Sequence, residues 1–111
     1  MLAVHYRGRT LLFTGDLEAE GEELLVASGI EHADVVKVPH HGSPTSSSAG
    51  LIDATRPALA VISCGRGNAF GFPSRDVLAR WQAAGAHIAR TDMDGSIAVV
   101  VDAAGRLFVV E

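Results

Sequence analysis

The amino-acid sequence predicts an α/β domain in which a mixed sheet is flanked by helices. Short runs of Val, Ile, Leu and Phe alternate along the chain with Ala-, Glu- and Leu-rich stretches at helical spacing. Many of its 12 glycines fall at the ends of those stretches, where tight turns are expected. A length of 111 residues, 48% of them hydrophobic, suits one small domain or a piece of one and excludes a disordered or collagen-like chain.

The first part of the chain is expected to form a strand, a helix and a second strand. The apolar run at 11–13 indicates a buried strand that ends in a polar turn. Residues 17–28 predict a helix, because acids occupy its early turns and Gly29 follows it as a stop. The β-branched residues of 33–38 predict a short strand that Pro39 ends.

The second part of the chain continues the alternation and then closes with strands. Residues 46–55 predict a helix capped by a serine, and 59–63 predict a third buried strand. Apolar residues at helical spacing predict a further helix over 74–84, which Gly85 ends. Closing strands are expected at 87–90, 97–101 and 107–110, joined by turns at Asp94-Gly95 and Ala104-Gly105. The predicted order is β-α-β-α-β-α-β-β-β.

Composition excludes several functional classes. The formal net charge of −4 argues against a generally basic nucleic-acid surface, although it leaves open a local phosphate site built on metal ions. Membrane spans need about 18 consecutive apolar residues, and the sequence has no such run. Residues 1–10 hold no apolar stretch of signal-peptide length, so no export signal is expected there. A single cysteine, Cys64, excludes a disulfide framework and a multi-cysteine zinc site.

The strongest chemical signal is the histidine pair that follows the second predicted strand. Ligands of open α/β sheets gather beyond the carboxyl ends of strands, and His40 and His41 lie at such an end. Neutral imidazole is a common zinc ligand. Neighbouring side chains on an extended segment point in opposite directions, so one histidine is expected to bind metal and the other to face substrate. The alternative is a surface turn that happens to contain two histidines.

Asp16, at the end of the first predicted strand, is the second candidate ligand. Its carboxylate could bridge two ions at the rim of the sheet, or it could cap the helix that begins near residue 17; taken alone, the residue fits a cap better. A working zinc site needs three protein ligands and an open position, which Asp16, His40 and His41 barely supply. The chain therefore looks like half a metal centre. The remaining histidines are isolated and are expected at the surface or on edge strands: His5, His32 and His87.

A glycine-rich loop at 65–71 could contact phosphate through Arg66 and Asn68. Its glycine spacing does not match the dinucleotide-binding fingerprint, so an ordinary glycine loop is an equal alternative. The segment that starts at Asp92 resembles the beginning of a calcium loop, but it lacks the glycine and the glutamate that such a loop requires, and we interpret it as a hairpin turn. The hydroxyl cluster at 45–48 fits a helix cap or a phosphate contact.

Nucleophilic catalysis is the competing enzyme class. The sequence has no Gly-x-Ser-x-Gly elbow. Cys64 ends a predicted strand and could act as a nucleophile with His41 and Asp16, but a lone cysteine in this position is more often a small buried apolar residue.

Several segments together resemble one known family. They are LLFTGDLE at 11–18, KVPHHGS at 37–43, TSSS at 45–48, PALAVIS at 57–63, GRGNAFGFP at 65–73 and TDMDGSI at 91–97. Their order and spacing are similar to those of the C-terminal half of the metallo-β-lactamase-like domain of the ComEC family, the DNA-internalisation competence proteins. The resemblance covers roughly residues 2–102, and it identifies 1–111 as a partial domain of this type.

This resemblance implies half of an αβ/βα sandwich with a zinc or manganese site on its rim. It implies that Asp16 bridges two ions, that His41 binds metal and that His40 contacts the phosphate as a catalytic residue. Further substrate contacts are expected from Ser43, Arg66 and Asn68. The implied activity is phosphodiester hydrolysis, with single-stranded DNA as substrate and a membrane channel domain of the parent protein as partner. The implied location is a soluble domain on the extracytoplasmic side of a membrane-associated bacterial protein, or the cytoplasm if this chain is expressed alone.

The sequence departs from the family pattern in two respects. The family's main metal motif, His-x-His-x-Asp-His, lies upstream of the first shared segment and has no counterpart in 1–111. Relatives commonly have histidine where this chain has Phe72. The chain is therefore expected to be weakly active alone and to associate with itself or with the absent half. The alternative function is a non-catalytic module that docks DNA or the channel, which Phe72 favours.

Overall fold

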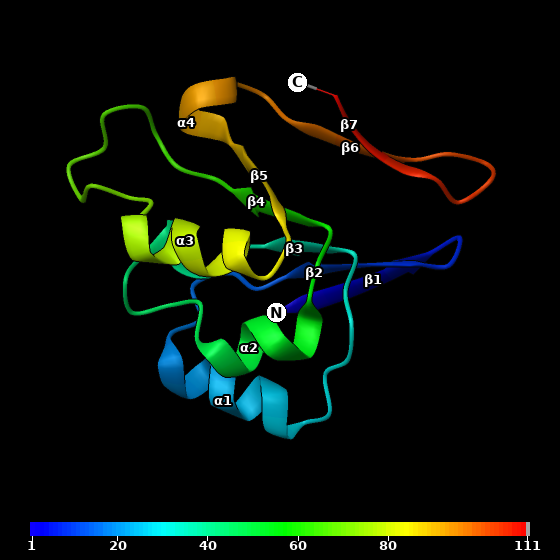
Figure 1. The fold of residues 1–111 in the computed structure, drawn as a ribbon, viewed down its shortest axis with the longest axis horizontal. Coiled ribbons are helices and arrows are strands. Elements are labelled where there is room, and N and C mark those ends of the chain that lie inside the picture. The colour runs from blue at the N-terminus through cyan, green and yellow to red at the C-terminus, as the bar shows by residue number, and fades with distance from the viewer. Residues whose placement is uncertain (111) are drawn as a thin grey trace.

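A five-stranded mixed sheet forms the middle layer of the molecule (Figure 1). The computed structural model describes residues 1–110. The strands lie side by side in chain order: β1 Leu2–Tyr6, β2 Arg9–Phe13, β3 Val35–Lys37, β4 Leu59–Ile62 and β5 His87–Arg90. β1 pairs antiparallel with β2, and every later neighbour pairs parallel. The carboxyl ends of β2 to β5 therefore share one edge of the sheet.

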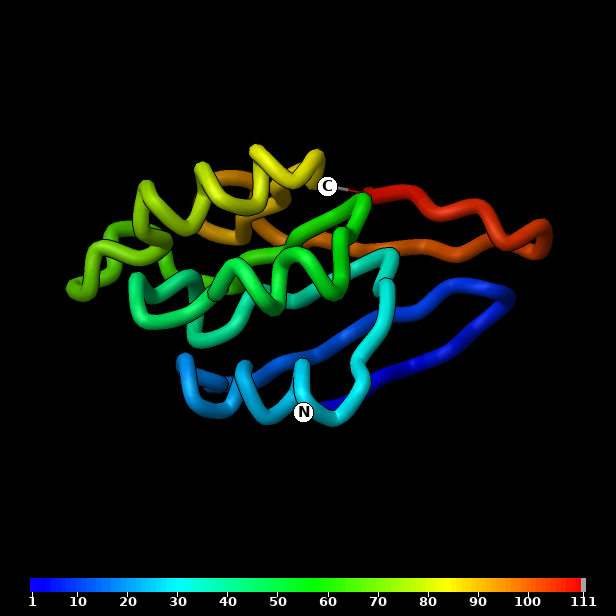
Figure 2. Tube along the Cα trace, turned by 60° about the horizontal axis from the view of Figure 1, so that its bottom comes forward, coloured from blue at the N-terminus to red at the C-terminus, as the bar shows by residue number. Residues whose placement is uncertain are grey.

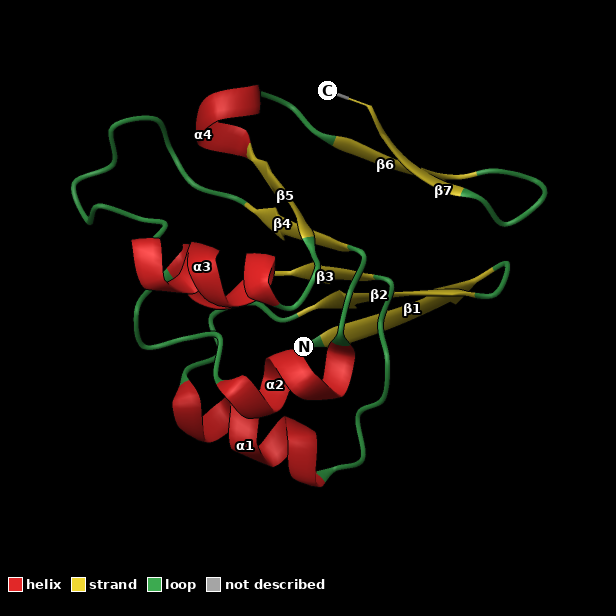
Figure 3. Ribbon diagram, in the orientation of Figure 1, coloured by secondary structure: helices red, strands yellow, loops and turns green. Residues whose placement is uncertain are grey.

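Three helices cover one face of this sheet: α1 Ala19–Ala27, α2 Ala49–Thr55 and α3 Arg75–Ala83 (Figure 3). Alternate strand residues point toward them, as Leu12, Val36 and Ala60 do, because successive side chains of a strand point to opposite faces. Trp81 of α3 is fully buried and is the largest side chain of this core. No helix within 1–110 has the length and apolar character needed to cross a bilayer.

A two-stranded antiparallel ribbon covers part of the opposite face. It consists of β6 Ala98–Val101 and β7 Leu107–Val110, and a short helix, α4 Thr91–Asp94, leads into it from β5. Its apolar residues pack on Val35, Leu59 and Ala89 of the main sheet. In the rotated view of Figure 2 the β1–β2 and β6–β7 turns extend to the same end of the molecule, where Arg9 Nε donates to the carbonyl of Gly105 at 2.7 Å.

The ribbon leaves an apolar groove of about 280 Å³ open on this face, along β2 and β3. Leu11, Phe13, Val35 and Val61 of the sheet line it, together with Val99 of the ribbon. The two faces of the sheet are thus covered unequally, by three helices on one side and by one ribbon on the other.

The predicted α/β class, with a mixed sheet flanked by helices, is confirmed. The helix expected over 17–28 begins at Ala19, and the helix and strand predictions after it fall within a few residues of the observed elements. The prediction omitted β1. The hairpin turn predicted at Asp92–Gly95 is wrong: the segment forms α4, and the strands on either side of it belong to different sheets. The physical reason is local, because Asp94 Oδ2 accepts from the Arg90 backbone N–H at 3.0 Å and so stabilises a helical turn.

Candidate functional site

Loops that follow β2, β3 and β4 meet at the carboxyl edge of the sheet, as the parallel strand order requires. The turn after β2 contains Gly15, whose carbonyl accepts from the His40 backbone N–H at 2.9 Å. The hydroxyl of Thr14 donates to the carbonyl of Lys37 at the end of β3. These bonds hold the turn that carries Asp16 against the histidine pair.

The histidine pair lies in a tight turn, η1 Pro39–Gly42, and not in an extended segment. His40 and His41 both adopt left-handed backbone conformations, with φ of 49° and 54°. The premise that their side chains alternate as in a strand is therefore wrong. Gly42, at the end of this turn, packs closely on a distant segment: a Cβ on Gly42 would lie 2.6 Å from Cβ of Pro73, and the Gly42 carbonyl accepts from Ser74 N–H at 2.9 Å.

His41 is oriented by a backbone carbonyl. Its Nδ1 lies 2.6 Å from the carbonyl oxygen of Ser63, which can only accept, so Nδ1 carries a proton and Nε2 is the nitrogen that bears the lone pair in the neutral ring. Nε2 lies 3.8 Å from Oδ1 of Asp16. A metal-binding histidine usually donates from one ring nitrogen to a carbonyl or carboxylate, which orients the other nitrogen toward the ion.

Asp16 is not a helix cap. The N-cap position of α1 is occupied by Glu18, whose side chain makes no capping hydrogen bond. The Asp16 side chain is 77% exposed and close to Nε2 of His41. The Asp16 carboxylate therefore does not cap α1, as the sequence had favoured.

His40 has different neighbours from His41. Its Nδ1 is buried and makes no hydrogen bond, although Oε1 of Glu18 lies 3.3 Å away. Its ring meets the ring of Phe72 edge-on, with centroids 5.9 Å apart. The two histidines thus lie close together and face different groups, with ring centroids 6.3 Å apart.

The donors present fit one part of a metal centre. Two ligands of a tetrahedral zinc ion lie about 3.4 Å apart. The Asp16–His41 separation of 3.8 Å is a small side-chain rotation away from that value. Among residues 1–110, no group of three or more His, Cys, Asp or Glu side chains lies close enough to hold an ion. The remaining ligands of a complete site would have to come from outside these residues.

A cavity of about 480 Å³ opens beside the histidine pair. Both imidazoles line it, and the loop after β4 supplies the rest of its wall, including Phe70, Phe72 and Asn68. Its volume lies within the range of ligand sites, about 300–1,000 Å³. The cavity is thus large enough for a small ligand or one part of a polymer.

The remaining predicted contact residues are partly occupied by bonds within the protein. Asn68 Nδ2 donates to the carbonyls of Gly65 and Phe72, and its Oδ1 accepts from Phe72 N–H. Ser43 is buried, and its Oγ lies 2.9 Å from Oγ1 of Thr45. Arg66 is exposed and uses Nε alone, at 3.3 Å from the carbonyl of Asp92.

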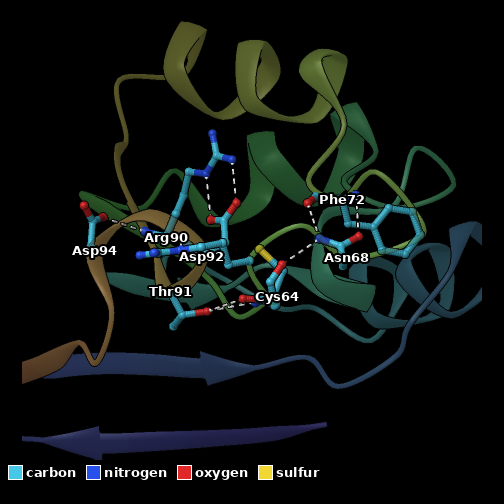
Figure 4. A network of polar contacts seen from close by, with 9 residues as sticks. Cys64, Asn68, Phe72, Arg90, Thr91, Asp92 and Asp94 are labelled. Atoms are coloured by element: carbon cyan, nitrogen blue, oxygen red, sulfur yellow. Dashed lines mark hydrogen bonds and ion pairs between the residues drawn. The ribbon is translucent and has the colours of Figure 1, made fainter.

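The environment of Cys64 disfavours a thiolate nucleophile (Figure 4). Burial, followed by a hydrogen bond to Asp92, raises the pKa of the Cys64 thiol. The guanidinium of Arg90 donates twice to Asp92, at 3.1 and 2.8 Å, and lowers the pKa of that carboxyl despite its burial. Both nitrogens of His41 face other groups, Ser63 and Asp16, so His41 is not positioned as the base for this thiol.

The sequence did not indicate the part played by Glu22. This side chain of α1 is fully buried and accepts from the backbone N–H groups of Ser47 and Ser48, both at 2.7 Å. Ser47 has a φ of 62°, and its Oγ accepts from Trp81 Nε1 at 2.9 Å. The network fixes the serine segment that follows η1. Glu22 precedes the buried Leu25 by three residues, and this helical spacing is the one signal that would have placed it on the inner face.

The chain is similar in sequence to several known bacterial proteins. The chain is 41% identical over 99 residues to "Competence protein ComA" of Neisseria gonorrhoeae, a match that covers 87% of this chain and 14% of that protein. It is 40% identical over 92 residues to "ComE operon protein 3" of Bacillus subtilis, covering 81% of this chain and 12% of that protein. It is 38% identical over 90 residues to "Recombination protein 2" of Haemophilus influenzae, covering 81% of this chain and 11% of that protein.

No family model matches the chain, and no solved structure matches it significantly. The chain spans only 11–14% of the length of these curated relatives. It is therefore related in sequence to a short segment of proteins named for competence and recombination.

Proposed function

We propose that this chain serves DNA uptake in competence and supplies part of a metal-dependent phosphodiester hydrolase site. The competence role is supported by the names of its relatives. The hydrolase role is supported above all by one observation: a carboxylate and a carbonyl-oriented imidazole, Asp16 and His41, face each other at 3.8 Å beside a cavity.

Asp16 and His41 are the residues that would hold zinc or manganese. The chemistry that a divalent ion supplies in such sites is a nucleophile made from water near neutral pH, together with neutralisation of phosphate charge. The Ser63 carbonyl keeps the proton of His41 on Nδ1 and so keeps Nε2 available as a donor. The carboxylate of Asp16 lies near Nε2 of His41 and would supply the negative charge that favours binding of a cation.

His40 and Arg66 are the proposed substrate contacts. His40 lines the cavity beside His41, and the Nη atoms of the exposed Arg66 can meet a phosphate. Ser43 and Asn68 could contact substrate only by giving up bonds that shape the two loops. Their proposed part is therefore to hold the loops that carry the contacts.

The site would be completed by the rest of the parent protein. The relatives are many times longer than this chain, so the additional ligands, the other half of the domain and a membrane channel domain are proposed to come from the parent protein. The present domain would then lie on the extracytoplasmic side of the membrane. The open apolar groove along β2 and β3 is a surface where such a half-domain, or a second copy, could pack.

Metal binding tests the ligand assignment directly. We expect the chain to bind Mn²⁺ or Zn²⁺ weakly by isothermal titration calorimetry, and His41→Asn to weaken that binding by at least about tenfold. Asparagine suits this position because it tolerates the left-handed backbone. His87→Asn is the matched control, since His87 is exposed on β5. Equal binding by the His41 and His87 variants would refute the assignment.

Hydrolysis is tested in the longer parent protein with single-stranded DNA and Mn²⁺. We expect cleavage that Asp16→Asn and His41→Asn each abolish. Should the parent protein leave DNA intact with every divalent metal, the second candidate function holds, namely a non-catalytic module that docks DNA or the channel. That alternative is favoured by the absence of a three-donor group within 1–110 and by the aromatic side chain of Phe72 in the cavity wall.

A further inference from the structure

Two phenylalanines of the loop after β4 form a stacked pair at the mouth of the cavity. The rings of Phe70 and Phe72 have centroids 5.4 Å apart and planes inclined by 18°. Phe70 is 78% exposed, the highest value among the exposed large apolar residues of the described chain. Holding a large apolar ring in water is unfavourable, by about 25 cal/mol per Å² of exposed apolar surface. An exposed ring kept at a cavity mouth therefore points to a ligand with a flat apolar face.

Phe72, on which the Phe70 ring stacks, is anchored at its backbone and at its ring although it lies in a loop. Asn68 bonds both the N–H and the carbonyl of Phe72, at 2.9 and 2.7 Å. Pro73 packs against Gly42, and the ring of Phe72 rests on His40. A fixed aromatic surface loses little conformational freedom when a planar ligand stacks on it.

The charged side chains near the two rings favour some planar ligands over others. The exposed carboxylates Asp16 and Glu18 lie beside the histidine pair and oppose a strong grip on phosphate in the absence of a cation. One cation, Arg66, lies in the same loop as the two rings. A ligand with a flat uncharged part and a single phosphate nearby fits this distribution, and a nucleotide of a DNA strand is such a ligand.

We propose that Phe70 and Phe72 form a stacking platform for an unpaired base of single-stranded DNA. Base–aromatic stacking tolerates any sequence because every base has a π-face. In a duplex, both faces of each internal base are covered by its neighbours, so the platform favours single strands, whose unpaired bases can present a free face. The inference rests on the proposed function, because it names the strand and the contact by which the hydrolase site would hold its substrate.

Fluorescence anisotropy with a short labelled oligothymidylate, in EDTA, tests this proposal apart from metal and hydrolysis. We expect Phe70→Ala to weaken binding by about tenfold or more and Phe70→Trp to preserve it. Phe108→Ala is the matched control, since Phe108 is exposed on β7, and it should bind as the unchanged chain does. Phe72→Leu, which keeps an apolar side chain in the loop, should also weaken binding.

Two comparison ligands sharpen the result. A strand of the same backbone with abasic sites, and a blunt duplex, should both bind more weakly than oligothymidylate. A single phosphate contact through Arg66 should give a slope of about −0.7 in a plot of log affinity against log salt. Equal affinity for abasic and thymidine strands, an unchanged affinity of Phe70→Ala, or no binding of oligothymidylate by the unchanged chain would each overturn the platform.

The platform and the hydrolase can fail separately. If Phe70→Ala weakens oligothymidylate binding but the parent protein cleaves no DNA, the platform is supported and the proposed activity is refuted. If His41→Asn abolishes hydrolysis but Phe70→Ala leaves the affinity for oligothymidylate unchanged, the activity is supported and the platform is refuted.

Discussion

Glu22 holds the serine segment behind the histidine turn, and its replacement should cost the fold several kilocalories per mole. Its carboxylate accepts from Ser47 N–H and Ser48 N–H at 2.7 Å each, with the side chain fully buried. A hydrogen bond to a charged group contributes about 1.5–3 kcal/mol, and a buried donor left without a partner costs about as much. Glu22→Gln keeps one acceptor oxygen and should lose about 2–3 kcal/mol of unfolding free energy. Glu22→Ala loses both acceptors and should lose about 3–6 kcal/mol.

Urea unfolding followed by the fluorescence of Trp81 measures this loss. Trp81 is the sole tryptophan of the chain, is fully buried, and donates to Ser47, so it reports on the affected region. The midpoint should fall while the slope with denaturant stays the same. Glu23→Gln is the matched control, because this neighbouring acid is exposed and should change stability by no more than about 0.5 kcal/mol. Equal midpoints for the Glu22→Gln and Glu23→Gln proteins would refute the reasoning.

Three further predictions concern the loops of the site. The Arg90 hydrogen bonds lower the pKa of Asp92 below its ordinary 3.8, so the pair stabilises the fold above that pH and ceases to do so as the pH falls through the folded value. Asp92→Asn should therefore destabilise the chain in urea at neutral pH and have progressively less effect as the pH falls below 3.8; an effect that does not change with pH would contradict this. Because burial and Asp92 raise the pKa of the Cys64 thiol, iodoacetamide should alkylate it more slowly than free cysteine at pH 8, and Asp92→Asn should speed the reaction; alkylation at the free rate would contradict this. Gly42→Ala places a Cβ 2.6 Å from Cβ of Pro73 at a φ of 80°, so it should lose about 2 kcal/mol or more in the same urea assay, and a loss under about 1 kcal/mol would contradict the close packing.

Much of the fold follows from local patterns in the sequence. The Val- and Leu-rich strands and the glycine stops of the helices are signals within a few residues, and the structure places β3, β4 and β5 where these signals lie. β1 was missed because it lies at the edge of the sheet with all but one of its residues exposed, so burial imposes no alternating pattern on its sequence. Helix α4 was missed because an aspartate before a glycine, as in Asp94-Gly95, is typical of a turn. In the structure Asp94 instead accepts a hydrogen bond from the Arg90 backbone N–H, which the sequence does not reveal.

The candidate site was predictable where strand topology decides it. Asp16 and His41 follow neighbouring parallel strands, and the structure brings them to 3.8 Å of each other. The left-handed backbone of the histidine turn was not predictable from local sequence, because the turn contacts segments far from it in the chain: Gly15, and Pro73, which lies 31 residues beyond Gly42. The role of Glu22 was marked only by its helical spacing to Leu25, a signal outweighed by the rule that a glutamate within a helix is almost always solvated unless it is paired.

The order of strands in the main sheet also has a consequence for synthesis. Each strand from β2 to β5 pairs with the strand that precedes it in the chain, so its partner has already been made when it emerges. Loop closures then stay local, which favours rapid assembly. The sheet can grow at one edge as translation proceeds, and the β6–β7 ribbon alone must wait until the surface it covers is complete.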